Sequence, residues 1–158
     1  MYLAGIGVNQ IMTRKYSLTQ FLILIFLYWF MATTIHEYGH LIALRIMGGE
    51  GFIISGALNR VKATPEFYAL MTQSMKMFWG VMGGATSATF LIIKRSIESD
   101  LEDQVIQTMI ILHEAVYMVF ETYALGFNYS YMAIGGWVAL IVMMAYLVYK
   151  ILTSELSL

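Results

Sequence analysis

The chain lacks cysteine, has a single proline and carries little charge: 12% of its 158 residues are charged and 59% are hydrophobic. Without cysteine there can be no disulfides and no thiolate zinc site, so a bound metal would need His, Asp or Glu ligands. Soluble domains carry about 25% charged residues. A bilayer can hide the excess apolar surface that a soluble core of this size could not bury. The formal net charge of −1 gives no reason to expect a nucleic-acid partner.

Long apolar runs predict four membrane spans. The first is framed by a Ser17–Gln20 capping box and by Gly48-Gly49, and a second capping box at Ser99–Glu102 precedes the third. The expected apolar segments are residues 18–47, 77–93, about 103–125 and 131–149. We therefore expect an all-α membrane protein with four transmembrane helices, forming one membrane-embedded domain over residues 1–158 with both ends on the same side.

The segment between the first two spans, residues 50–63, has a strand-like pattern and not a helical one. Phe52-Ile53-Ile54 favours a strand, Gly56 allows a turn, and residues 57–61 could pair back. A short β-hairpin or an extended loop are both compatible with this pattern. The next helix is expected to begin at Thr64-Pro65-Glu66 and to run to Ile93.

The first span contains the motif His36-Glu37-Tyr38-Gly39-His40. Residues four apart share one face of a helix, so the two imidazoles can point at one metal ion. Glu37 lies beside them, where a carboxylate can take a proton from a water that zinc has made acidic. A carboxylate inside a membrane span costs about 2.5 kcal/mol or more, which favours a functional reason for its presence. The alternative is a polar cluster that only ties helices together.

The third span adds His113, Glu114 and Glu121 within an apolar helix. With Glu37 this places three acids at membrane depth, where a divalent cation or a proton could balance them. Counted from the shared ends of spans one and three, Glu114 is nearly level with His36 and Glu121 is nearer to His40. We rank Glu114 first as the third zinc ligand, then Glu121, then His113, and expect the others to support the ligands.

These residues resemble the site-2 protease family of intramembrane zinc metalloproteases. The resemblance covers residues 30–93: the His36–His40 motif, then Ala43, Gly48-Gly49 and a strand-prone stretch, and a second span containing Gly83-Gly84. It implies that His36 and His40 bind Zn²⁺, that Glu37 activates water, and that residues 52–61 offer a strand edge to an unwound transmembrane substrate. The family's third ligand is an Asp in an Asn/Pro-rich motif ending in Asp-Gly, which this chain lacks.

The predicted function is hydrolysis of peptide bonds in membrane-spanning protein or peptide substrates, with the lipid bilayer as surroundings. Three alternatives stay open: a four-helix membrane protein holding haem between His36 and His113, an ion transporter using Glu37, Glu114 and Glu121, and a pseudoprotease that binds helices without cutting them. We expect a multi-pass protein of the cell membrane. Its orientation is open, because the charge count slightly favours cytoplasmic termini and the family resemblance favours the reverse.

Overall fold

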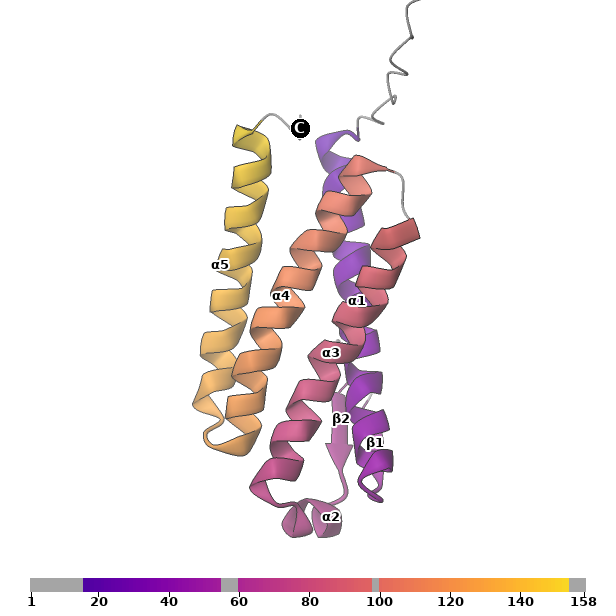
Figure 1. Ribbon diagram of the computed structural model, residues 1–158, viewed down its shortest axis with the longest axis vertical. Coiled ribbons are helices and arrows are strands. Elements are labelled where there is room, and N and C mark those ends of the chain that lie inside the picture. Colours follow the sequence, from indigo (N-terminus) through magenta and orange to yellow (C-terminus); the bar gives the residue numbers. More distant parts are fainter. Residues whose placement is uncertain (1–15, 55–59, 98–99, 154–158) are drawn as a thin grey trace, which may run out of the picture.

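The structure, a computed structural model, describes residues 16–54, 60–97 and 100–153. The chain is an all-α membrane protein with four long helices and a short hairpin, as predicted (Figure 1). Its elements are α1 (Leu18–Ile46), β1 (Gly51–Ile54), β2 (Arg60–Ala63), α2 (Pro65–Leu70), α3 (Gln73–Ile97), α4 (Leu101–Gly126) and α5 (Ser130–Leu152).

The ends of α1 form as the sequence predicts. Ser17 caps the first turn: its hydroxyl accepts from the Gln20 backbone N–H at 3.3 Å, and the Gln20 side chain accepts from the Ser17 backbone N–H at 2.9 Å. At the other end Gly48 adopts a φ of +77°, and Gly49 N–H donates to Leu44 O at 2.8 Å. At about 1.5 Å per residue, these 29 residues span roughly 43 Å, more than the ~30 Å hydrocarbon thickness.

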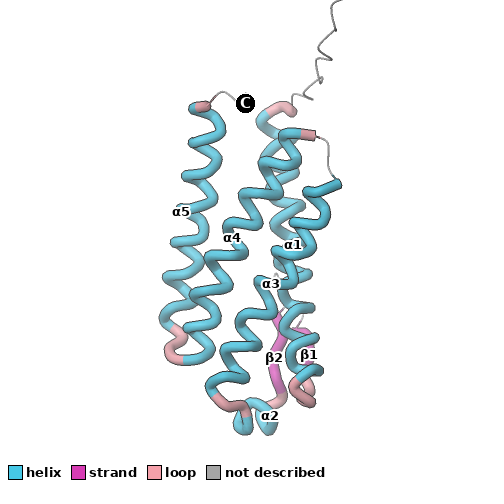
Figure 2. Tube along the Cα trace, in the orientation of Figure 1, coloured by secondary structure: helices cyan, strands magenta, loops and turns pink. Residues whose placement is uncertain are grey.

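The loop after α1 is a two-stranded antiparallel hairpin, which decides between the two predicted alternatives. Ile53 faces Val61 and Phe52 faces Lys62 in its register. The predicted turn at Gly56 and most of residues 57–61 lie outside the described residues. The hairpin folds back beside the C-terminal half of α1, so β2 stands next to the predicted motif (Figure 2).

The second helix differs from the prediction because it is broken. Met71 takes an extended conformation (φ −67°, ψ 123°), which ends α2, and Thr72 then opens α3 by accepting from Met75 N–H at 3.3 Å. A short helix and a separate candidate span therefore replace one continuous helix from Pro65. α3 also continues through Lys94 to Ile97, beyond the predicted end at Ile93.

The remaining helices keep close to their predicted bounds. Asp100 caps α4 by accepting from Glu102 N–H at 3.1 Å, whereas Ser99, the predicted cap, lies outside the described residues. A short link at Asn128 and Tyr129 leads to α5. The start of α1 and the end of α5 lie at the same end of the bundle, opposite the hairpin and α2 (Figure 1).

Helix α3 packs closely against α1 and α4 because glycines at these interfaces let the helices approach one another. A Cβ on Gly80 would lie 2.8 Å from Thr122 Cα of α4, and one on Gly84 would meet Met118 of the same helix. Toward α1, Gly39 lies against the Met82 carbonyl and Thr86. α4 in turn packs against α5, while α1 and α5 make little direct contact.

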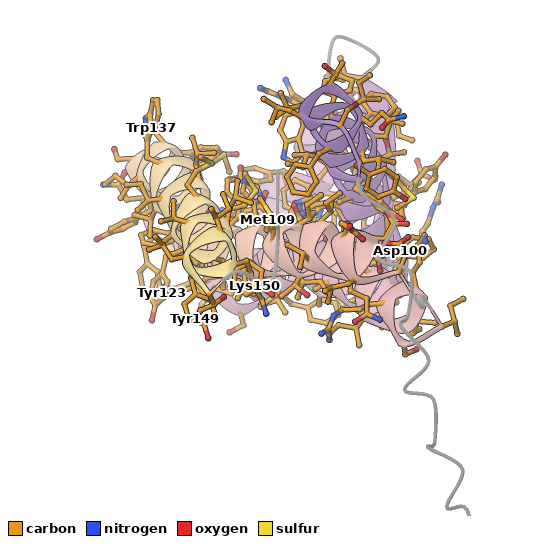
Figure 3. The ribbon with its side chains drawn as sticks, turned by 90° about the horizontal axis from the view of Figure 1, so that it is seen from above. Asp100, Met109, Tyr123, Trp137, Tyr149 and Lys150 are labelled. Carbon is orange, nitrogen blue, oxygen red and sulfur yellow. The ribbon has the colours of Figure 1, made fainter. Side chains whose placement is uncertain are left out.

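All four long helices are long and apolar enough to cross a membrane, and large apolar side chains cover their outer surfaces. On α5 the Trp137 side chain is 69% exposed and points away from the bundle, whereas Met109 of α4 is fully buried near its centre (Figure 3). In water so much exposed apolar surface would be unfavourable, but facing lipid it has no such cost.

Candidate metal centre

Four candidate site residues of α1 and α4 lie between two apolar clusters. One cluster contains Ala32 and Ile110, and the other contains Ala43 and Leu125. The four residues between these positions, His36 and His40 on α1 and Glu114 and Glu121 on α4, are all at most 6% exposed. Packing above and below therefore fixes α1 and α4 where these side chains face one another.

Three of these side chains converge on one point. His36 Nε2 lies 3.0 Å from His40 Nε2 and 2.9 Å from Glu121 Oε2, and His40 Nε2 lies 3.2 Å from Glu121 Oε1. Nitrogen and oxygen ligands bound to zinc at 2.0–2.1 Å in a tetrahedron stand roughly 3.3 Å apart. The spacing of these three side chains therefore suits a single small cation.

The hydrogen bonds of the two imidazoles decide what their converging atoms can do. His40 Nδ1 lies 2.8 Å from the Trp79 backbone carbonyl, which can only accept, so this nitrogen carries a proton. His36 Nδ1 lies 2.9 Å from Glu114 Oε2 and donates to that carboxylate. In neutral rings both Nε2 atoms then bear lone pairs. Two lone pairs and a carboxylate meeting at about 3 Å repel one another unless a cation or added protons lie between them.

Glu114 is held by three groups around its carboxylate. Besides His36, Ser87 Oγ donates to Oε2 at 2.6 Å and His113 Nδ1 lies 3.2 Å from Oε1. The His113 ring also stacks on Tyr117 at a centroid distance of 6.1 Å. A carboxylate that receives the second N–H of a metal-binding histidine fixes the ring's tautomer and orientation. Glu114 is placed for that supporting role at His36.

Glu37, the expected base, lies on the neighbouring side of α1 and is half-buried. Its Oε2 accepts from the Val61 backbone N–H of β2 at 2.6 Å. Thr64 N–H donates to Glu50 O, so Glu50 and Thr64 form a hydrogen-bonded pair. Hydrogen-bonded and non-hydrogen-bonded pairs alternate along antiparallel strands, which makes Ile53 and Val61 a non-hydrogen-bonded pair. Val61 therefore points its backbone groups away from β1, toward Glu37. The free edge of β2 thus faces the motif.

A cavity of about 960 Å³ is lined by His36, Glu37, His40, Glu114 and Glu121. Its lining comes mainly from α1, α4 and α5, and β2 contributes Arg60 to Ala63. Most of the remaining wall is apolar, including Ile25 and Trp29 of α1 and Leu140 of α5. The candidate metal centre is therefore reached through an apolar cleft between helices that face lipid.

Gly83 makes room for the two rings. A Cβ at this position would lie 2.6 Å from His36 Nε2 and 2.6 Å from His40 Nε2. The sequence shows this glycine only as part of a small-residue face, which predicts helix packing. Its contact with the imidazoles could not be inferred without knowing which face of α3 meets α1.

The structure brings together every predicted site residue, in an arrangement that differs from the predicted ranking. The group with metal-binding geometry contains Glu121, while Glu114 contacts the opposite nitrogen of His36 and His113 contacts Glu114. Three further contacts were not predicted from the sequence: those of Ser87 Oγ, the Trp79 carbonyl and the Val61 N–H. The latter two are backbone groups, which no sequence pattern reveals.

Comparisons with protein-family models, with curated proteins and with solved structures gave no match to this chain.

Proposed function

We propose that this protein is an intramembrane zinc metallopeptidase with the site-2 protease type of active site. The observation that carries the proposal is the convergence of two imidazole lone pairs and one carboxylate, next to Glu37 and inside the cleft. The H-E-x-x-H spacing on one helix supplies the first two ligands and the base. We assign His36, His40 and Glu121 as the zinc ligands and Glu114 as the support of His36.

The donor set fits zinc, which at catalytic sites is held by three protein ligands with nitrogen or oxygen donors. When bound, zinc polarises the scissile carbonyl and makes water acidic enough to be deprotonated near neutral pH. Glu37 takes the proton from the attacking water and passes it to the leaving amine. Glu114 and the Trp79 carbonyl keep the rings of His36 and His40 in the tautomers that ligation needs.

The substrate must present an extended backbone, because a helix hides its carbonyl groups in its own hydrogen bonds. The free edge of β2 offers groups to such a segment by strand addition. One of these groups, the Val61 N–H, is held by Glu37. A substrate strand that pairs with Val61 takes over this hydrogen bond and leaves the Glu37 carboxylate free to act on water.

The haem alternative has less support from the side-chain geometry. Both ring nitrogens of His36 contact carboxylate oxygens, of Glu114 and Glu121. The Glu114 carboxylate contacts both His36 and His113, and so lies between the two rings. The two imidazoles therefore do not face each other across a space for a macrocycle. The transporter alternative requires the three acids to exchange protons or ions, whereas Glu114 and Glu121 are bound to fixed partners.

The decisive experiment compares wild type with Glu37→Gln in lipid nanodiscs. Both should bind one zinc ion per chain, and only wild type should cleave an apolar peptide with an unwound segment. Glu66→Gln, at an exposed position on α2, is the matched control and should cleave normally. Cleavage by Glu37→Gln at the native rate would refute the assignment of Glu37 as the general base. Zinc-loaded wild type without activity on any membrane peptide would favour the pseudoprotease.

A further inference from the structure

Arg60 and Lys62 form a cationic edge on the cleft. Both residues belong to β2, both are exposed, and both line the cavity that contains the candidate metal centre. Residues two apart on a strand share one face, so their side chains lie on the side opposite Val61. Val61 is 7% exposed and packs into the apolar cluster with Ala43 and Leu44.

Among the described residues, neither cation has an ion-pair partner. The acids of the cleft are engaged elsewhere: Glu121 with the two imidazoles, Glu114 with His36 and Ser87, and Glu37 with the Val61 N–H. Cations beside an apolar membrane cleft are costly unless they meet a counter-charge. Within the part of the chain that the structure describes, the carboxylates that line the cleft contact other groups and form no ion pair with these two cations.

The net charge of the loaded cleft points the same way. The cleft is lined by three carboxylates, which carry three negative charges. The proposed divalent ion and the side chains of Arg60 and Lys62 would together carry four positive charges. One positive charge is left over if the histidines are neutral. An occupant with one negative charge would balance it.

We propose that the cleft binds an apolar membrane segment that carries an acidic residue next to its unwound stretch, and that Arg60 and Lys62 recognise this carboxylate. This inference rests on the proposed function for the course of the substrate along β2. A strand added at the free edge of β2 alternates its side chains between two faces. Those on the face of Arg60 and Lys62 are their cross-strand neighbours, where opposite charges attract.

The test measures binding, so that it does not depend on turnover. A fluorescent apolar peptide with one Glu at the end of its apolar stretch is compared with Gln and Lys versions, in nanodiscs of zwitterionic phosphatidylcholine, which carries no net charge. The protein carries Glu37→Gln throughout to prevent cleavage. We expect the Glu peptide to bind about fivefold tighter than the Gln peptide, and the Lys peptide to bind weakest.

Charge reversal gives the sharper readout. Arg60→Glu with Lys62→Glu should invert the order, so that the Lys peptide binds tightest. The matched control is Arg45→Glu, an exposed cation in the last turn of α1 that does not line the cleft, and it should leave the order unchanged. Zinc content confirms that each variant keeps its site.

The outcomes separate this inference from the proposed function. Equal binding of the three peptides, or the same order after charge reversal, would overturn the cationic-edge inference even if the wild type is an active peptidase. Equal binding would leave lipid headgroups as the partners of the two cations. An inverted order after charge reversal, together with a zinc-loaded wild type that cleaves no membrane peptide, would support the recognition and refute the enzyme.

Discussion

Replacing each of the two buried acids of α4 by glutamine should separate a metal ligand from its support. Glu121 places both carboxylate oxygens within 3.2 Å of imidazole Nε2 atoms, while Glu114 accepts from the Nδ1 side of His36. Loss of a supporting carboxylate typically costs 10–100-fold in metal affinity. This corresponds to about 1.4–2.7 kcal/mol. Glu114→Gln should fall in that range, and Glu121→Gln should lose more than about 100-fold because a ligand is gone.

The assay is a competitive zinc titration of purified protein against a chromophoric chelator. Glu102→Gln is the matched control, since this acid is also buried on α4 but lies in its first turn, several turns before Glu114. It should bind zinc like wild type. A larger loss of zinc affinity in Glu114→Gln than in Glu121→Gln would refute the assignment and restore Glu114 as the third ligand.

Two further changes probe the same site. Gly83→Ala should abolish zinc binding, because its Cβ would lie 2.6 Å from both Nε2 atoms, whereas Gly136→Ala, with no atom within 4 Å of its Cβ, should bind zinc normally in the same titration. Zinc at a hundred times its dissociation constant should stabilise the wild type by about 2.7 kcal/mol. Thermal unfolding in detergent should therefore shift upward with zinc in wild type and not in His36→Ala, and an equal shift in both would place the metal elsewhere.

The fold was largely predictable because its signals are local. Apolar runs define the four spans, and the Ser17 cap and the Gly48 turn are short-range patterns that formed as expected. The break after α2 was not predictable from Met71 and Thr72, neither of which is a helix breaker. It depends on tertiary packing, since Met71 is 6% exposed within the cluster that contains Trp79.

The position of a residue along its helix predicts only part of the site. Helical spacing correctly predicts that Glu114 lies level with His36, and the two side chains do touch at 2.9 Å. Depth cannot say which ring nitrogen is contacted, because that depends on how each helix is rotated about its axis. Gly80 and Gly84 set the rotation of α3 against α4, and Gly39 and Gly83 set it against α1.

The same contacts distinguish a metal ion from a single proton as the cation at this point. One added proton on His36 Nε2 would satisfy its contacts with Glu121 and His40 together. It would leave the His40 Nε2 lone pair 3.2 Å from Glu121 Oε1, with nothing between them. A divalent ion held by His36, His40 and Glu121 would relieve all three contacts, and it would also balance the charge of a carboxylate that is buried away from water. The lone pairs of His40 and Glu121 thus favour a metal over a lone imidazolium.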